Sequence, residues 1–236
     1  MTDISLGPQH GPQEEFLKND SDIAFYGGAA GGGKTYALLL DFLRHYNNGE
    51  AGAVCFRRTS NQVRNEGGLW DTSKKIYSLL GASPKESSLT WVFPAGCKLK
   101  FSHLEYNKNV NDWQGAQIPI IYFDELTHFT EKQFWYMLSR NRSVSGVKPY
   151  IRATTNPSAK SWVKKLVEWY IGDDGLPIKE RAGVKRYFIR DDNKLVWSTD
   201  KKELERNYPE GLPKSFTFIP SKLSDNRILC KTDPSY

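Results

Sequence analysis

Short, almost continuous apolar stretches alternate along this chain with segments whose apolar residues recur at every third or fourth position. The first pattern is typical of strands buried on both faces of a parallel sheet, and the second of helices packed against it. The predicted buried strands are residues 22–27, 51–57, 118–123 and 149–155. The predicted helices are residues 13–18, 36–43, 69–80, 131–140 and 159–170. We therefore expect an α/β fold with a mainly parallel central sheet flanked by helices.

Two segments predict antiparallel hairpins, and the second lies where the overall pattern changes. The paired stretches are residues 89–93 with 98–101, and residues 184–190 with 194–197, the latter turning at residues 191–193. A short helix around residues 200–206 and a strand at residues 215–219 follow. Because the pattern changes after the GDDG stretch, we expect a core of residues 1–171 and a small C-terminal subdomain, a lid or linker, of residues 172–236.

A glycine-rich loop, residues 28–35 (GAAGGGKT), lies between the first buried strand and the helix after it. It matches G-x-x-x-x-G-K-[ST], the P-loop that holds nucleoside triphosphates, although a glycine-rich turn can also arise by chance. Glycines let several backbone N–H groups point at one anion, and the helix N-terminus adds a favourable dipole. The lysine would reach the β- and γ-phosphates, and the threonine hydroxyl would bind Mg²⁺. The expected cofactor ligands are Gly28, Gly31, Gly32, Gly33, Lys34 and Thr35.

Two acids, Asp124 and Glu125, end the apolar stretch 118–123. An acid at the end of a buried strand is the Walker B pattern, in which the first carboxylate holds Mg²⁺ opposite the P-loop threonine. The second carboxylate is a candidate general base for the attacking water. The alternative is an ordinary strand followed by the acidic start of a helix. The pairing with a P-loop favours the catalytic interpretation.

Two polar positions fit a nucleotide site, but their spacing alone leaves their roles open. Asn156 follows Thr154 and Thr155 at the end of a predicted strand, where an amide would lie beside the γ-phosphate. An ordinary Asn-Pro turn explains this position equally well. Gln13 lies shortly before the P-loop strand, and a glutamine can contact adenine with both amide atoms. An exposed helix residue is the alternative for Gln13.

Composition adds little to this picture. The 236 residues carry a net charge of +6, which is compatible with a polyanionic partner and equally with dispersed surface charge. Cys55, Cys97 and Cys230 are too far apart for a metal site and do not suggest disulfides. No apolar stretch approaches the roughly 20 residues that span a bilayer, and the polar N-terminus lacks the features of a signal peptide. We expect no membrane partner and a cytoplasmic location.

Taken together, these motifs resemble the ATPase domain of the large terminase subunit of tailed bacteriophages, the motor that packages DNA into procapsids. The match rests on the order and spacing of Gln13, the P-loop, the two acids and the Thr-Thr-Asn-Pro stretch at residues 154–157. Further matches are Arg57-Arg58-Thr59, residues 140–143 (RNRS), residues 218–220 (FIP) and Asp225-Asn226. The resemblance covers essentially the whole chain and implies a P-loop NTPase fold of the ASCE type.

The resemblance also implies roles and partners. It implies that Gln13 senses adenine, that Lys34 and Thr35 bind phosphate and Mg²⁺, and that Asn156 ends a coupling motif. It further implies Asp124 as the metal-side acid and Glu125 as the catalytic carboxylate. The implied cofactors are ATP and Mg²⁺. The implied partners are double-stranded DNA, the portal of the procapsid, a small terminase subunit and further copies of the chain. The copies are expected to form a pentameric ring in the host cytoplasm, whereas an isolated chain can be monomeric.

Two departures from the family pattern matter. Many members carry an arginine shortly before Walker B, where this chain has Trp113-Gln114-Gly115. An arginine that completes a neighbouring subunit's site must therefore be sought elsewhere, and we favour Arg142 among Arg58, Arg64, Arg140 and Arg142. Complete large terminases continue into an RNase H-like nuclease domain. The chain ends at Tyr236, so we expect an ATPase domain that does not cleave DNA.

Three functions fit these residues. The first is an ATP-hydrolysing motor domain that moves double-stranded viral DNA into a procapsid. The second is a helicase-like DNA translocase, which strand separation would favour. The third is a nucleotide-dependent DNA-binding or scaffold protein with little hydrolysis. The intact Lys34, Asp124 and Glu125 favour hydrolysis over the third.

Overall fold

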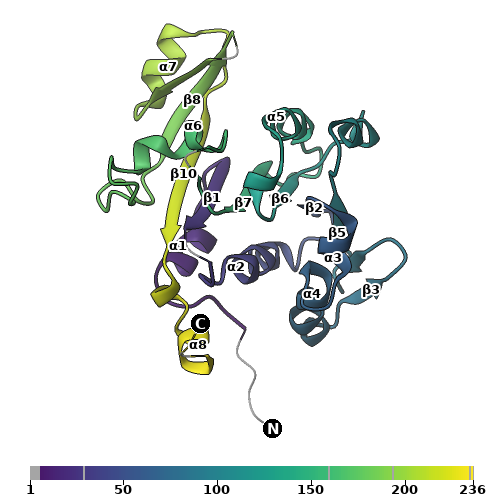
Figure 1. Cartoon of the computed structure of the whole chain (residues 1–236). Helices are drawn as coiled ribbons and strands as arrows, with labels where there is room; N and C mark the ends of the chain where they lie inside the picture. The colour runs from purple at the N-terminus through teal and green to yellow at the C-terminus, as the bar shows by residue number, and fades with distance from the viewer. Residues whose placement is uncertain (1–5, 29, 159, 193, 234, 236) are drawn as a thin grey trace.

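One ten-stranded sheet runs through the computed structural model, which describes residues 6–28, 30–158, 160–192, 194–233 and 235 (Figure 1). Across the described residues the strand order is β3-β4-β5-β2-β6-β7-β1-β10-β8-β9. In that order the strands are Ser83–Lys85, Thr90–Val92, Lys98–His103, Gly52–Arg57, Ile120–Phe123, Tyr150–Thr155, Ile23–Gly28, Lys214–Ser221, Arg186–Asp191 and Lys194–Ser198.

The central part of the sheet is parallel, as the apolar strands predict. From β5 through β2, β6, β7 and β1 to β10, every neighbouring pair of strands is parallel. The outer strands on both sides of this group pair antiparallel. β7 lies between β1 and β6, which is the strand insertion that defines ASCE P-loop folds. The predicted α/β class is confirmed. Because parallel strands end at one edge, the loops after β1, β6 and β7 meet there.

Helices cover both faces of the sheet. Within the described chain the α-helices are α1 (Pro12–Lys18), α2 (Lys34–Asp41), α3 (Ser60–Arg64), α4 (Leu69–Tyr77), α5 (Glu131–Arg140), α6 (Lys164–Val167), α7 (Lys201–Asn207) and α8 (Arg227–Thr232). Residues of α1, α2 and α4 share one apolar core with one face of the sheet, and residues of α5 and α6 share a second core with the other face. The side chains of β6 alternate between the two cores, since Tyr122 enters the first and Phe123 the second.

Several helix boundaries follow from local chemistry. α5 begins where predicted, because the Thr130 side chain caps it by accepting a hydrogen bond from the Gln133 backbone N–H at 3.2 Å. The helix predicted at residues 69–80 is α4 followed by a 3-10 turn, and it ends at Gly81, whose φ is +70°. The polar stretch after β2 forms the short helix α3, and Asn107–Trp113 forms a 3-10 helix that the pattern did not predict.

The helix predicted at residues 159–170 is wrong in extent. Ala159 lies outside the described residues, and the α-helix covers only Lys164–Val167 before a 3-10 turn at Glu168–Tyr170. Serine hydroxyls compete for the backbone N–H groups ahead of this helix, as Ser161 Oγ does at 3.3 Å from the Val163 nitrogen. The strand predicted at residues 118–123 starts only at Ile120, because the Ile118 N–H donates to the Arg140 carbonyl instead.

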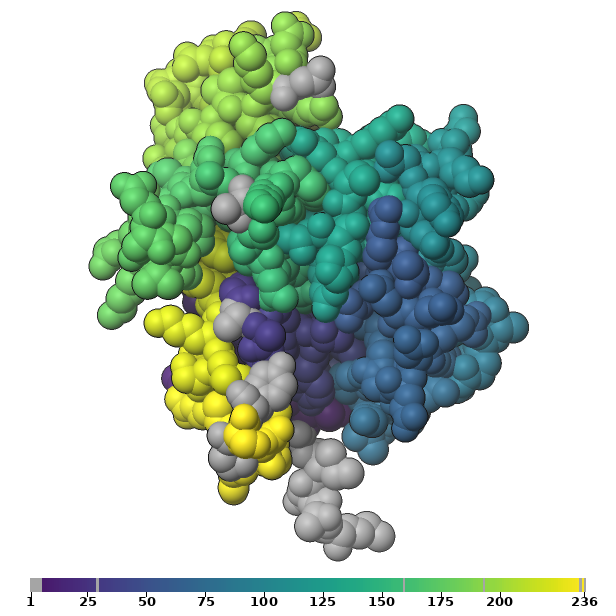
Figure 2. All heavy atoms as spheres, in the orientation of Figure 1, coloured from purple at the N-terminus to yellow at the C-terminus, as the bar shows by residue number. Residues whose placement is uncertain are grey.

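The C-terminal segment adds strands to the same sheet. β8 and β9 form the predicted hairpin, of which Asn193 lies outside the described residues, and β10 pairs with β1 over the whole length of β1. With α7, the hairpin projects beyond the rest of the molecule at the top of Figures 1 and 2. The division into residues 1–171 and 172–236 stays a prediction. No helix in the described part of the chain is long and apolar enough to cross a membrane.

Candidate active site

A cavity of about 670 Å³ lies at the edge of the sheet where β1, β2, β6 and β7 end. Its walls come from the loop between β1 and α2, the ends of three strands, the start of α4 with the two glycines before it, and a segment near the C-terminus. The predicted site residues that line it are Gly31, Gly32, Gly33, Lys34, Thr35, Asp124, Glu125 and Asn156. The fold thus brings together most of the residues that the motifs predicted as ligands.

The glycines of the loop meet a steric requirement. A Cβ atom on Gly28, whose φ is +137°, would lie 2.0 Å from the Ser221 carbonyl oxygen, so only glycine fits between β1 and β10. Gly33 has a φ of +68°, in the left-handed region that favours glycine. Gly33 therefore turns the backbone directly into the first residue of α2. Ala29 lies outside the described residues.

Lys34 and Thr35 begin α2 and point toward the acids that follow β6. The Lys34 Nζ atom lies 3.5 Å from the Gly28 carbonyl oxygen. Burial lowers the pKa of Lys34, while the charges of Asp124 and Glu125 oppose this shift. The Thr35 hydroxyl donates to Asp124 Oδ1 at 3.1 Å, although 89 residues separate the two. This contact joins the P-loop to the end of β6.

Asp124 is fully buried and held by contacts from two strands and a helix. Burial raises the pKa of its carboxyl group, against the opposing effect of the Arg57 cation and the Thr154 hydrogen bond. The Thr154 hydroxyl donates to Asp124 Oδ1 at 2.6 Å and accepts from the Glu125 N–H at 2.8 Å. Thr154 therefore ties the end of β6 to β7, just before Asn156.

Glu125 has a strained backbone, with a φ of +60° that a residue with a side chain rarely adopts. Its side chain is 36% exposed, so it faces the cavity while that of Asp124 is buried. Glu125 Oε2 lies 2.7 Å from Arg57 Nη1 and 3.0 Å from His128 Nδ1. The turn at Glu125 thus separates two adjacent carboxylates into a buried one and an accessible one.

Arg57 is a site residue that the motif analysis did not assign a role. Its Nε lies 2.8 Å from Asp124 Oδ2, and its Nη1 lies 2.7 Å from Glu125 Oε2. One guanidinium therefore contacts both acids. A signal was present in the sequence, because Arg57 ends the predicted strand 51–57 and parallel strands end at a common edge.

The side chains of Gln13 and Asn226 donate hydrogen bonds to backbone carbonyls of the P-loop. Gln13 is buried, and its side-chain amide donates to the Gly33 carbonyl at 3.0 Å, but it does not line the cavity. Asn226 lines the cavity, and its amide donates to the Gly31 carbonyl at 2.5 Å. Gln9 joins the two, since its backbone N–H donates to Gln13 and its side-chain amide donates to Asn226. Segments from both ends of the chain thus support the loop.

None of the four candidate arginines, all of which the structure describes, lines this cavity. Arg140 and Arg142 lie at the end of α5 and just after it, where the Arg140 carbonyl accepts from the Ile118 N–H, ahead of β6. That is the opposite edge of the sheet, so neither reaches the site of its own chain. Arg58 donates to the Gln133 side chain at 2.8 Å and to a backbone carbonyl, and Arg64 is exposed at the end of α3.

The residues at the site fit Mg²⁺. A hydroxyl from Thr35 and a carboxylate from Asp124 converge, and both supply the hard oxygen ligands that this ion requires. No group of three or more His, Cys, Asp or Glu side chains suited to a metal occurs among the described residues. Mg²⁺ is usually held by one or two protein oxygens together with substrate phosphates, so a partial ligand set is what a nucleotide-bound ion needs.

Solved structures of phage large terminases share the fold of this chain. No curated protein sequence matches the chain. The large terminase from a thermophilic bacteriophage, in complex with ADP, aligns with a TM-score of 0.59 at 14% identity, over 95% of this chain and 48% of that one. The complex of the same terminase with ATP-γ-S gives 0.54 at 17% identity, over 96% and 47%. The Thermus phage P74-26 large terminase ATPase domain gives 0.53 at 11% identity, over 94% and 84%.

These likenesses show the fold, and the chain spans about half the length of the first two terminase chains. The family is shown by sequence. A family profile described as terminase large subunit, T4likevirus-type, N-terminal, matches residues 25–236, which include both the P-loop and the acids after β6. The chain therefore belongs to the terminase large subunit family, T4likevirus-type, and corresponds to its N-terminal part.

Proposed function

We propose that this chain is an ATP-hydrolysing motor domain that moves double-stranded viral DNA into a procapsid. One observation carries the proposal: Thr35 of the P-loop contacts Asp124, and the accessible carboxylate of Glu125 lies beside this pair. A site of this kind positions a nucleoside triphosphate, a metal ion and a water molecule together. Family membership and the related structures with ADP and ATP-γ-S favour ATP as the nucleotide.

Binding is expected at the P-loop. Backbone N–H groups at the start of α2 face the cavity and would hold the phosphates, and the Lys34 ammonium would neutralise the β- and γ-phosphates. Gln13 fixes the loop through the Gly33 carbonyl, and we assign it the role of sensing adenine. Asn226 and Leu229 would form the wall beside the nucleoside.

Thr35 and Asp124 would hold Mg²⁺. When bound there, the ion would offset the negative charge that develops on the phosphates during transfer. Arg57 supplies a second positive charge next to Asp124 and Glu125. We assign Arg57 the role of balancing these two acids and the phosphate charge in the same subunit.

Hydrolysis needs a base that orients water. Glu125 accepts a proton from a water molecule as the water oxygen attacks the γ-phosphorus, and the bond from phosphorus to the bridging oxygen breaks to leave ADP. Its carboxylate is accessible, and Arg57 and His128 hold it in one orientation. Catalysis then comes from positioning and electrostatics, with no covalent intermediate on the protein.

Coupling to DNA is expected to run through β7. The Thr154 hydroxyl joins Asp124 to β7, which ends just before Asn156. Loss of the γ-phosphate beside Asp124 would therefore change the position of the end of β7. The proposed partners are DNA, the procapsid portal, a small terminase subunit and further copies of the chain in a ring. The net charge of +6 is suitable for contacts to DNA phosphates.

The substitution Glu125→Gln tests this proposal. We expect ATP affinity within about twofold of the wild type and turnover lower by about a hundredfold or more, since general-base catalysis contributes roughly 10²–10⁴-fold. ATP binding and phosphate release are measured on the same samples, the latter also under single-turnover conditions. Glu131→Gln is the matched control, because Glu131 pairs with Lys165 on α6, away from the cavity. Wild-type turnover in Glu125→Gln would overturn the assignment.

A further inference from the structure

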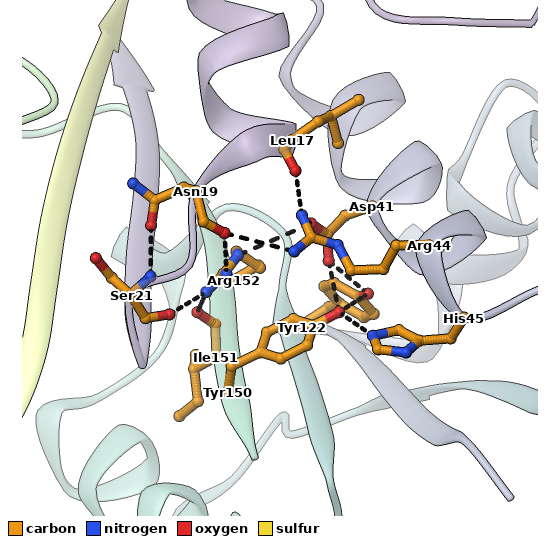
Figure 3. Close-up of polar contacts among 10 residues, drawn as sticks. All are labelled: Leu17, Asn19, Ser21, Asp41, Arg44, His45, Tyr122, Tyr150, Ile151 and Arg152. Carbon is orange, nitrogen blue, oxygen red and sulfur yellow. Dashed lines mark hydrogen bonds and ion pairs between the residues drawn. The ribbon is translucent and has the colours of Figure 1, made fainter. Parts of the chain in front are cut away.

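A buried polar cluster lies toward the ends of the central strands that are opposite the cavity (Figure 3). At its centre is Asp41, the last residue of α2, whose side chain is fully buried. The hydroxyl groups of Tyr122 and Tyr150 each donate to Asp41 Oδ2 at 2.8 Å. Arg44 Nη2 lies 2.5 Å from Asp41 Oδ1, and Arg152 Nε lies 3.8 Å from the same oxygen. One carboxylate therefore organises two tyrosines and two arginines.

The cluster joins the same elements that carry the proposed active site. α2 begins with Lys34 and Thr35 and ends with Asp41. Tyr122 lies on β6, two residues before Asp124, and Arg152 lies on β7, two residues before Thr154. Alternate residues of a strand point to the same face, so each pair faces α2. The site and the cluster are thus two ends of one arrangement of a helix and two strands.

The segment that carries Gln13 enters the cluster as well. The Arg152 guanidinium donates to the Asn19 carbonyl at 2.8 Å and to the Ser21 carbonyl at 2.9 Å, in the link between α1 and β1. Arg44 donates to the Leu17 carbonyl at the end of α1 (Figure 3). Arg152 is also 4.3 Å from the centre of the Tyr150 ring, so the side chains pack as well as pair.

The hydroxyl groups remain protonated and available as donors. Burial, followed by the nearby Asp41 charge, raises the pKa of both Tyr122 and Tyr150 well above the usual value for a tyrosine. A buried carboxylate without such donors is unfavourable, because it leaves solvent without compensation. The two tyrosine hydroxyls compensate the buried carboxylate and thereby tie the end of α2 to β6 and β7.

We propose that Asp41, Tyr122 and Tyr150 are positioning residues for ATP hydrolysis, which hold α2 against β6 and β7 so that Thr35 and Asp124 stay in register for Mg²⁺. The inference rests on the proposed function. α2 is a stiff element only about 12 Å long at roughly 1.5 Å per residue, so a shift at Asp41 is passed to Thr35 with little loss. Displacement of reacting groups by about 1 Å can lower a rate about a hundredfold.

The test removes hydroxyl groups and leaves the rings in place. Tyr122→Phe, Tyr150→Phe and the double variant are compared with Tyr77→Phe. Tyr77 is a matched control, because its hydroxyl is also buried and donates at 2.7 Å to Leu39 of the same helix, but it ties α2 to α4. Asp41→Asn serves as a further variant that keeps the shape and removes the charge.

The readouts are ATP affinity with and without Mg²⁺, and kcat separately from KM. For the double variant and Asp41→Asn we expect Mg²⁺-free ATP affinity within about twofold of the wild type, and a loss of about tenfold or more in both kcat and the Mg²⁺-dependent gain in affinity. Tyr77→Phe is expected to lose thermal stability while retaining both quantities.

Two results would overturn the inference: a double variant that keeps the Mg²⁺-dependent gain and kcat, or a Tyr77→Phe variant that loses them equally. Either result would leave ATP hydrolysis by the wild type intact. Failure of the proposed function is recognised differently, because the wild type itself would then show neither Mg²⁺-dependent ATP affinity nor phosphate release.

Discussion

Adjacent residues at the end of β6 have different environments. Asp124 is fully buried and linked to Thr35 and Thr154, whereas Glu125 turns into the cavity through a backbone conformation with φ of +60°. This strain is consistent with a functional requirement, since such conformations persist where surrounding contacts enforce them. Consecutive positions thus supply the proposed metal ligand and the proposed base.

Arg57 influences the pKa of Asp124. Burial raises the pKa of Asp124, and the Arg57 cation opposes that rise. In Arg57→Ala, the pKa of Asp124 therefore rises further. Since Mg²⁺ requires the ionised carboxylate, Mg²⁺-dependent ATP affinity should be lost at a higher pH than in the wild type as the pH falls.

The measurement is the dissociation constant of ATP with Mg²⁺, followed as the pH is lowered from about pH 8. Arg58→Ala is the control, because the neighbouring Arg58 pairs with Gln133 and not with the acids. If Arg57→Ala and the wild type lost Mg²⁺-dependent ATP affinity at the same pH, the role given to Arg57 would be contradicted.

At the scale of elements, the segment between β10 and α8 forms one wall of the cavity. Asn226 precedes α8 and donates to the Gly31 carbonyl, so a hydrogen bond joins this segment to the P-loop. In Asn226→Ala we expect ATP affinity to fall about fivefold, since a net hydrogen bond contributes about 1 kcal/mol.

Equilibrium titration with ATP measures this loss. Asn48→Ala removes a side-chain hydrogen bond from an exposed turn, which the Asn48 oxygen makes with the Glu50 N–H, and it should leave ATP affinity unchanged. Equal affinity in Asn226→Ala and Asn48→Ala would show that the C-terminal segment does not support the nucleotide site.

Local patterns predicted much of this arrangement. The buried strands could be recognised from apolar stretches, and the motifs at their ends placed Lys34, Thr35, Asp124 and Glu125 at one edge. Contacts between distant segments could not be recognised, because Asn226 reaches Gly31 only once β10 lies beside β1. The extent of the helix at residues 159–170 was wrong since serine side chains compete locally with the helical hydrogen bonds.

At the scale of the whole molecule, the two edges of the sheet have different roles. One edge holds the cavity, and the other holds the Asp41 cluster together with Arg140 and Arg142. A head-to-tail ring brings one surface of a subunit against a different surface of its neighbour. In the ring that we propose, an arginine remote from its own site is a candidate to act on the next subunit.

A mixing experiment tests the prediction that Arg142 acts between subunits. Arg142→Ala and Glu125→Gln chains are each expected to be inactive as assembled rings, for different reasons. In mixed rings, an intact Glu125 from one chain can meet an intact Arg142 from the other, so part of the phosphate release should return. No recovery would exclude Arg142, and the same test then applies to Arg64 and Arg140.

We propose that ATP and Mg²⁺ bind between the P-loop and the acids after β6. The most direct test is a crystal structure of the chain with ATP-γ-S and Mn²⁺, whose anomalous signal locates the metal ion. We predict the metal next to Thr35 Oγ1 and Asp124, with the γ-thiophosphate facing Glu125. A nucleotide bound away from Lys34, or a metal ion that contacts neither Thr35 nor Asp124, would contradict the account.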